Sequence, residues 1–244
     1  MSMRITINGL EQEIVYDHHA LDDLIIPMLR QWMQATTDGR RHWAFLVAPP
    51  GAGKSVLAEL IGSALAPDLQ CLGLDGFHFP QAYLQHNTYR DAVGQETPLS
   101  TIKGAPETFD AERLAQYIEQ SRHRDVAWPV YDRTLHDVVD GVERVAASHV
   151  LLEGNWLLLD DPRWNALRPL AERVIFIDAP EGVLRKRLVD RKVQGGLTQG
   201  EAEAFFERSD GPNVRRVLTQ SNLANVDLLL AMQADGSLIE SELS

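Results

Sequence analysis

Residues 46–55 read Leu-Val-Ala-Pro-Pro-Gly-Ala-Gly-Lys-Ser, an apolar run that enters a glycine-containing loop and leaves it at the start of a helical pattern. A strand, a glycine loop and a helix in this order are the context of a phosphate-binding loop. Its backbone N–H groups point into one hollow, and the helix N-terminus adds a partial positive charge. We therefore expect Lys54 to reach the β- and γ-phosphates of a nucleotide, and the Ser55 hydroxyl to bind Mg²⁺.

The loop departs from the usual pattern at its first position, where Ala48 replaces a glycine. Pro49 and Pro50 carry no N–H, so the amide donors begin only at Gly51. The donors that remain suffice for a β-phosphate cradle. The expected nucleotide-binding residues of the loop are Gly51, Ala52, Gly53, Lys54, Ser55 and Val56.

A dinucleotide-binding fold is an alternative, because Asp75 lies about 20 residues beyond the loop, where such folds place a ribose-binding acid. The motif Gly-x-Gly-x-x-Gly is absent, however, and Lys54 followed by Ser55 suits a phosphate chain with a metal better.

Short apolar runs alternate with amphipathic segments over most of the chain. The candidate strands are 43–47, 70–74, 149–153, 173–178 and 226–230, and helical patterns cover 54–65, 110–122, 180–192 and 199–208. This alternation predicts an α/β fold of the P-loop NTPase type, with a parallel sheet of about five strands covered by helices on both faces.

The first 40 residues are predicted to be an addition to this domain, which spans 41–244. Two β-prone runs flank Asn8-Gly9, a strong signal for a two-residue hairpin turn. Apolar residues then recur at helical spacing from Leu21 to Trp32, with Pro27 as a candidate kink. The apolar face of this helix covers either the core or the surface of a second subunit. In the second case the protein would be a homodimer. No recognised motif lies in 1–40, so we expect nucleotide binding to survive its removal.

Composition restricts the partners. The formal net charge is −12, which disfavours nucleic acid and anionic membranes as partners. No apolar run reaches the ~18 residues of a membrane span, and the N-terminus lacks the apolar core of a secretion signal. The single cysteine, Cys71, allows no internal disulfide. We expect a cytoplasmic protein whose partner is a small molecule.

Two candidate strands end in acids, Asp75 and Glu153. Parallel sheets place their chemistry at the carboxyl ends of their strands. Asp75 can orient, or take the proton of, a hydroxyl that attacks the γ-phosphate, and Glu153 can hold the metal through water or bind substrate. Either acid alone is as often a helix cap or a turn residue, but beside a phosphate loop the pair favours phosphoryl transfer.

Three motifs follow one another along the chain: Leu-Asp-Gly-Phe-His-Phe-Pro at 74–80, Lys-Gly-Ala-Pro-Glu-Thr-Phe-Asp at 103–110, and Pro-Val-Tyr-Asp-Arg at 129–133 with Leu-Leu-Glu-Gly at 151–154. Over 43–230 the chain resembles the phosphoribulokinase/uridine kinase group of P-loop kinases. It is most similar to type I pantothenate kinases and to a bacterial branch described as nucleoside or fructose-transport-system kinases. The resemblance implies transfer from ATP with Mg²⁺ to a small-molecule hydroxyl, with Asp75 as the catalytic base.

The resemblance also implies the residues beside the acceptor, which are Lys103, Tyr131, Arg133 and His136. His78 stands where type I pantothenate kinases typically carry an apolar residue, and it is either a packed histidine or a ligand. The acceptor stays open among sugars, nucleosides and pantothenate-like alcohols.

Arg187 and Arg191 stand four residues apart on one helix face. In similar kinases arginines of this segment lie at the lid and contact ATP, whereas the alternative is a solvated basic face. Asp210-Gly-Pro-Asn213 resembles a turn near the nucleotide in the bacterial branch.

A regulatory protein that binds and slowly hydrolyses ATP is the alternative function, with a partner docked on the N-terminal hairpin and helix. Such a protein has no need of acceptor-side residues such as Lys103 and Arg133, which favours the kinase.

Overall fold

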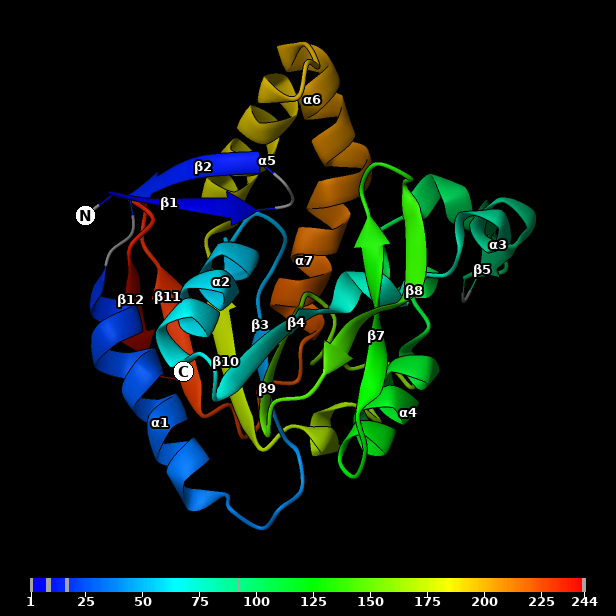
Figure 1. The fold of residues 1–244 in the computed structure, drawn as a ribbon. Coiled ribbons are helices and arrows are strands. Elements are labelled where there is room, and N and C mark those ends of the chain that lie inside the picture. Colours follow the sequence, from blue (N-terminus) through cyan, green and yellow to red (C-terminus); the bar gives the residue numbers. More distant parts are fainter. Residues whose placement is uncertain (1, 8–9, 16–17, 92, 243–244) are drawn as a thin grey trace.

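The computed structural model describes residues 2–7, 10–15, 18–91 and 93–242. Its centre is a six-stranded sheet (Figure 1). Five strands are parallel, and the sixth pairs antiparallel at one edge. In spatial order they are β12 (Leu238–Ser241), β11 (Leu228–Met232), β10 (Arg173–Asp178), β3 (His42–Val47), β9 (His149–Gly154) and β4 (Leu69–Gly73). The predicted α/β fold with a parallel sheet is confirmed. The antiparallel edge strand β12 was not predicted.

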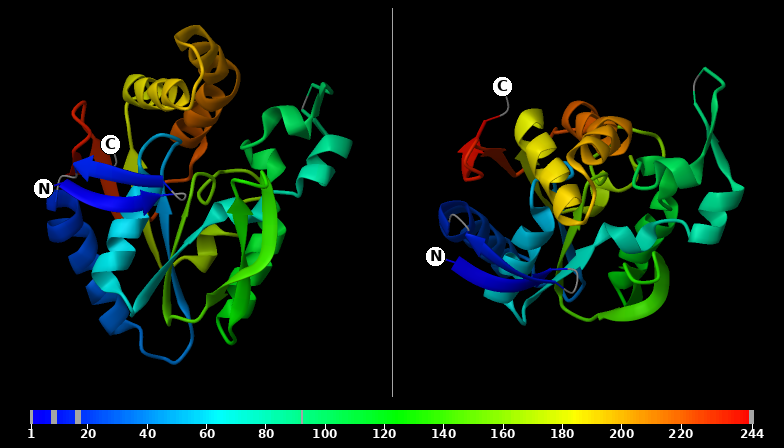
Figure 2. Two further views of the ribbon diagram at one scale, coloured as in Figure 1. Left: turned by 45° about the horizontal axis from the view of Figure 1, so that its top comes forward. Right: turned by 90° about the horizontal axis from the view of Figure 1, so that it is seen from above.

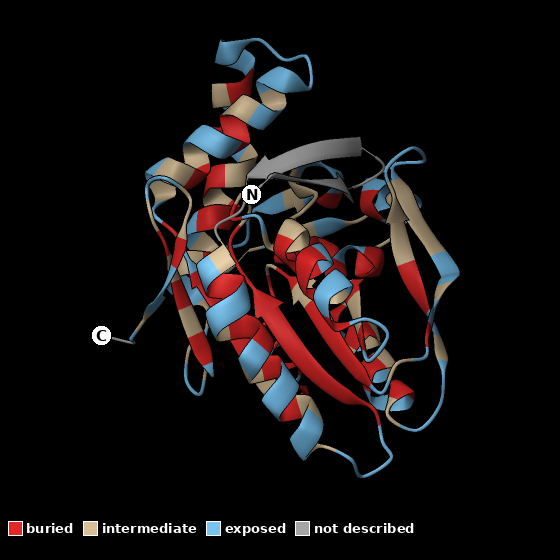
Figure 3. Ribbon diagram, turned by 60° about the vertical axis from the view of Figure 1, so that its left-hand side comes forward, coloured by how far each residue is buried: buried red, intermediate tan, exposed pale blue. Residues whose placement is uncertain are grey.

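The central strands are buried on both faces, as their continuous apolar runs predict. Along β3, Ala44 and Leu46 face one hydrophobic core, while Trp43, Phe45 and Val47 face the other. Figure 3 shows the buried central strands and the exposed outer sides of the helices that cover them.

Helices cover both faces of this sheet. The core on the Leu46 side includes buried residues of α1 (Ile26–Ala35), α2 (Lys54–Leu65) and α5 (Glu181–Gln194). The core on the Trp43 side includes residues of α4 (Ala111–Ser121), β7 (Val126–Asp132) and the segment 156–171, which contains a 3₁₀ turn at Arg168–Leu170. None of the described helices is long and apolar enough to cross a membrane.

The N-terminal segment packs on the body of the domain. Strands β1 (Ser2–Ile7) and β2 (Leu10–Val15) pair antiparallel, while the predicted turn at Asn8-Gly9 lies outside the described residues. A π-helical turn, His19–Ile25, runs directly into α1, and Pro27, which has no N–H to donate, is the second residue of α1.

The apolar stripe of this segment, from Ala20 to Trp32, is buried in the same core as α2. The stripe therefore covers the core, and removing residues 1–40 would uncover it. The domain boundary at residue 40 remains a prediction, and so does the formation of a homodimer.

Several elements were not predicted. Strand β7 pairs with β8 (Asp137–Val145), with an irregularity between Trp128 and Val130, where Pro129 carries no donor. A short arm follows β4 and stands out from the body (Figure 2). It comprises α3 (Gln81–His86), β5 (Thr88–Arg90), β6 (Glu96–Pro98) and a 3₁₀ turn at Leu99–Ile102.

The expected turn at Asp210–Asn213 is wrong, because this segment is helical. Helix α6 (Gln199–Phe205) continues through a π-helical turn, Phe206–Asp210, into α7 (Gly211–Gln220). The Gly211 N–H donates to the carbonyl of Phe206, five residues earlier. This wider turn lets Pro212, which has no N–H, begin α7.

Candidate active site

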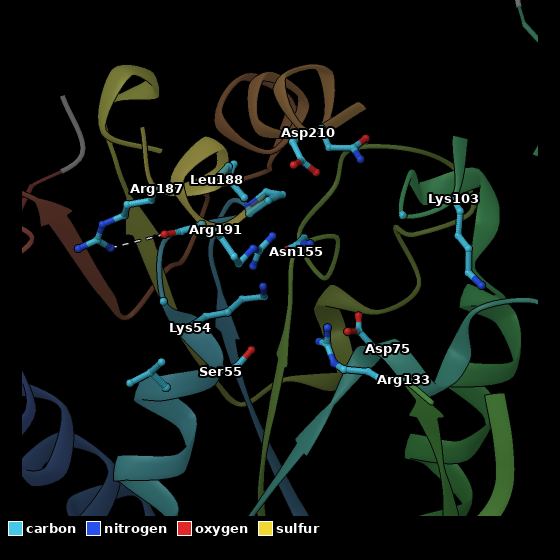
Figure 4. A pocket seen from close by; sticks show the side chains of 16 residues that line it. Lys54, Ser55, Asp75, Lys103, Arg133, Asn155, Arg187, Leu188, Arg191 and Asp210 are labelled. Atoms are coloured by element: carbon cyan, nitrogen blue, oxygen red, sulfur yellow. Dashed lines mark hydrogen bonds between the residues drawn. The ribbon is translucent and has the colours of Figure 1, made fainter. Parts of the chain in front are cut away.

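A cavity of about 400 Å³ opens where β3, β4 and β9 end (Figure 4). Its size is that of a small-molecule site. The lining residues are Pro50, Gly51, Gly53, Lys54, Ser55, Val56, Asp75, Lys103, Gly104, Arg133, Asn155, Arg187, Leu188, Arg191, Asp210 and Asn213. Most of the predicted site residues therefore lie around one space, although they come from five separate segments of the chain.

The phosphate loop has the backbone that its glycines allow. Gly51 and Gly53 have φ of 85° and 87°, in the left-handed region that favours glycine. Ala48 is buried and is not among the described residues with positive φ, so the usual glycine is not needed there. Gly53 caps α2, and its carbonyl accepts from the Leu57 N–H at 3.0 Å. The start of α2 thus faces the cavity.

Three side chains meet at the base of the loop. The Ser55 hydroxyl donates to Glu153 Oε1 at 2.8 Å, and Lys54 Nζ lies 3.8 Å from Glu153 Oε2. Burial raises the pKa of Glu153, and the positive charge of Lys54 opposes that rise. Glu153 also lines a smaller neighbouring cavity of about 140 Å³, together with Asp75, Tyr131 and Arg133.

The hydroxyl of Ser55 and the carboxylate of Glu153 are hard oxygen ligands of the kind that Mg²⁺ prefers. Among the residues that the structure describes, no group of three or more His, Cys, Asp or Glu could hold a metal ion. Mg²⁺ in phosphate sites needs only one or two protein ligands, because the phosphates and water supply the others. The donor set at Ser55 and Glu153 therefore fits this ion.

Asp75 lies in a 3₁₀ turn, Leu74–Phe77, that directly follows β4. Its side chain is exposed and lines both cavities. The next residue, Gly76, is buried against β7: a Cβ atom there would lie 1.9 Å from the Pro129 carbonyl oxygen. Only glycine allows this close approach, so Gly76 fixes where Asp75 projects.

We predict that Gly76→Ala destabilises the fold by about 1–3 kcal/mol, the usual cost of overpacking, since the backbone atoms of Pro129 cannot move aside as a side chain can. Chemical denaturation measures this change. Gly200→Ala is the matched control, because a Cβ atom at that helical position meets nothing within 4 Å. Equal stability of the Gly76 and Gly200 variants would contradict the close approach.

His78 is packed beneath the Asp75 turn. Its ring centroid lies 3.7 Å from that of Phe109, and its Nδ1 donates to the Asp75 carbonyl at 2.9 Å. Burial lowers the pKa of His78, which favours the neutral ring. His78 lines neither cavity, so the geometry favours the packed histidine over the ligand.

Lys103 is held on the far side of the cavity from the phosphate loop. Its Nζ donates to Gln81 Oε1 at 2.7 Å and to the His136 carbonyl at 2.9 Å, and it lies 4.9 Å from the centroid of the Tyr131 ring. His136 adopts a positive φ of 54° and contributes this carbonyl, while the residue itself lines neither cavity.

Helix α5 brings two arginines to the cavity. Arg187 Nη1 lies 3.5 Å from the Gly51 carbonyl oxygen, and Arg191 is one turn further along. Leu188 packs on the loop between them: a Cβ atom on Gly51 would lie 2.9 Å from its Cγ. The two guanidinium groups are thus exposed beside the phosphate loop, as expected for residues that contact phosphates.

Sequence reasoning missed the lining residue Asn155, and it named Asp210 only as the first residue of a segment, Asp210–Asn213, that resembles a turn near the nucleotide. Both Asp210 and Asn213 line the cavity. Asn155 Oδ1 and Asp210 Oδ2 are buried and have no hydrogen-bond partner among the described residues. Burial raises the pKa of Asp210, and Lys192 opposes that rise. Asn155 could have been found from its place two residues after Glu153. The helical junction that brings Asp210 to the cavity was not predicted.

The walls of the cavity are joined by one buried acid. The two carboxylate oxygens of Glu107 each accept from Arg216 Nη1 of α7 at 3.0 Å, and Arg163 donates to Oε1 at 3.1 Å. Trp156 Nε1 donates to the Gly104 carbonyl at 3.1 Å. The motif at 103–110 therefore holds Lys103 and Gly104 in place against α7.

The comparisons with known proteins give relatives along nearly the whole chain, although no protein-family model matches it. An uncharacterized Escherichia coli protein, YggC, is 41% identical over 97% of this chain and 98% of its own length. A Schizosaccharomyces pombe protein provisionally named a uridine kinase is 26% identical over 76% of this chain and 80% of its own. A crystal structure of a Silicibacter sp. TM1040 protein, provisionally named a fructose transport system kinase, superposes with a TM-score of 0.74 and 27% identity, over 84% of this chain and 97% of its own.

Proposed function

We propose that this chain, which belongs to the phosphoribulokinase/uridine kinase group of P-loop kinases, transfers the γ-phosphate of ATP to an alcohol group of a small molecule. Membership in this group implies the use of ATP. The observation that carries the proposal is the cavity in which Lys54 and Ser55 of the phosphate loop face Asp75 across one space (Figure 4).

The reaction is an in-line displacement in which the acceptor oxygen attacks the γ-phosphorus and the bond from that phosphorus to ADP breaks. Asp75 takes the proton that the hydroxyl loses and later returns it to water. Lys54, Arg187 and Arg191 neutralise charge that develops on the phosphate oxygens, in positions fixed before the reaction starts. Ser55 and Glu153 would hold Mg²⁺, which would supply further neutralisation of the phosphate charge.

The N–H groups from Gly51 to Val56 are proposed to bind the phosphate chain, since they surround the start of α2. Tyr131, Lys103 and Arg133 are proposed to contact the acceptor. We also propose a cytoplasmic location and a small molecule, not nucleic acid or a membrane, as the partner, because the net charge is −12.

Acceptor-dependent turnover tests the proposal. We expect release of ADP from MgATP to rise at least tenfold when a pool of small bacterial metabolites is added, with label from γ-labelled ATP appearing on an organic compound. Slow hydrolysis that stays the same with and without the pool would instead support the regulatory ATP-binding protein.

A further inference from the structure

We propose that the alcohol which accepts the phosphate also carries an acidic group, a carboxylate or a phosphate, that is bound by Lys103 and Arg133. This inference rests on the proposed kinase function. It starts from the charge of the cavity, where five cationic side chains and two carboxylates line the wall of a protein whose net charge is −12.

The cations of the cavity have few acid partners within the protein. Lys54 lies 3.8 Å from Glu153, but the other four form no ion pair with any described residue. In the nearby wall, by contrast, Arg163 and Arg216 both contact the buried Glu107. Cations that stay unpaired around a hollow are suited to anionic ligands.

The unpaired cations form two groups. Arg187 and Arg191 come from α5, beside the phosphate loop, and the triphosphate accounts for them. Lys103 and Arg133 come from segments on the acceptor side, after the 3₁₀ turn Leu99–Ile102 and between β7 and β8. In Figure 4 both lie on the side of Asp75, away from Arg187. The triphosphate does not account for this second group. The charge of Arg133 opposes the rise in the pKa of Glu153, but Arg133 forms no ion pair with any described residue.

Lys103 is positioned without being neutralised. Its two hydrogen-bond acceptors, the Gln81 amide oxygen and the His136 carbonyl, carry no charge. An ammonium group has three donors, so one remains for a ligand. The ring of Tyr131, 4.9 Å away, limits the freedom of the lysine head further. Such a fixed, half-buried charge lowers the entropy cost of binding an anion.

Arg133 is exposed and has no hydrogen bond or ion pair within the described part of the chain. Its planar fork matches the two oxygens of a carboxylate or a phosphate. Because Arg133 lines both cavities together with Asp75, a ligand that contacts Asp75 through its hydroxyl also comes within reach of the guanidinium.

The smaller cavity shows where the acidic group cannot lie. Besides Arg133 and Asp75 it is lined by Glu143 and Glu153, so three carboxylates surround it. An acid placed there would be repelled. The acidic group therefore points into the larger cavity, towards Lys103, while the hydroxyl faces Asp75. A neutral sugar or nucleoside would leave both cations unpaired beside the reacting phosphate.

The experiment divides a bacterial metabolite extract on an anion-exchange resin into neutral and anionic fractions, and incubates each with γ-labelled MgATP and the full-length protein. Label should enter compounds of the anionic fraction at least tenfold faster than those of the neutral fraction. Defined pairs, D-glycerate with glycerol and glucose 6-phosphate with glucose, then separate a carboxylate from a phosphate. Label from the neutral fraction alone would overturn this inference and leave the kinase intact, whereas label from neither fraction would count against the kinase itself.

Variants locate the contact. Arg133→Gln and Lys103→Gln should each raise the KM of the labelled acid by about 10–100-fold, the range for a lost charged hydrogen bond, while the KM for ATP stays within threefold. Arg30→Gln, an exposed arginine on α1, is the matched control and should change neither constant. An unchanged KM for the acid in both cavity variants would overturn the assignment.

Discussion

Replacing Lys54 by alanine should slow phosphoryl transfer by about 10²–10³ and leave the fold in place. Lys54 is the first residue of α2, and its Nζ lines the cavity beside the phosphate loop. In the proposed mechanism the amine neutralises negative charge that develops on the transferred group, so its loss should raise the barrier more than it weakens ATP binding. The initial rate with saturating MgATP and the acceptor pool measures the effect.

The substitution should cost little stability. The contact of Lys54 with Glu153 is loose, at 3.8 Å, and the hydrogen bond from Ser55 to the same carboxylate remains. Lys186→Ala, on the exposed side of α5, is the control for removing a lysine, because its partner Asp190 lies four residues along the same helix. A Lys54 variant with the turnover of the Lys186 variant would remove Lys54 from the mechanism.

The sheet and the phosphate loop could be predicted from the sequence because their signals are local. Strands buried on both faces read as continuous apolar runs, and β3, β9 and β10 appear within a residue or two of the predicted ranges. The last parallel strand was placed at 226–230 but runs from Leu228 to Met232, which is the uninterrupted apolar run between Asp227 and Gln233. The prediction wrongly included Val226, which stands before Asp227.

Elements outside the core escaped prediction for different physical reasons. Only Val145 of β8 is buried, so the strand shows no clean alternation of apolar and polar residues. Strand β7 contains Pro129, which is typical of strand edges and irregular pairing. Helix α7 begins with Gly211-Pro212, a pair that locally indicates a turn, and only the preceding π-helical turn makes room for it.

The site was predictable where residues follow strands and unpredictable where distant segments converge. Asp75 lies just after β4, and Glu153 lies near the end of β9. Because these strands are parallel neighbours, both acids come to the same edge of the sheet. Asp210 reaches the same cavity from a helical junction 135 positions later than Asp75. Its local pattern, Asp-Gly-Pro-Asn, predicts a turn and so hides this junction. His78 was left open between two roles because only the structure shows the Phe109 ring against it.

Asp75→Asn should lower the transfer rate by about 10²–10⁴, the usual worth of a positioned general base, while MgATP binds almost as before. The amide keeps the shape of the carboxylate but cannot take the proton of the acceptor. Lys54, Ser55 and the loop amides are untouched, so ATP affinity has no reason to change. The transfer rate is measured as turnover with the acceptor pool, and the ATP affinity is measured by titration. Asp190→Asn, on α5 and outside both cavities, is the control.

The structure also sets the expected stability of this variant. His78 is held by the backbone carbonyl of Asp75, which the substitution leaves in place, and the Asp75 carboxylate accepts no hydrogen bond from any described residue. The melting temperature should therefore stay within the range of the control, whereas a turn-capping acid would lose ~1 kcal/mol. A fall in ATP affinity together with rate would assign Asp75 to the metal instead, and unchanged turnover would exclude it as the base.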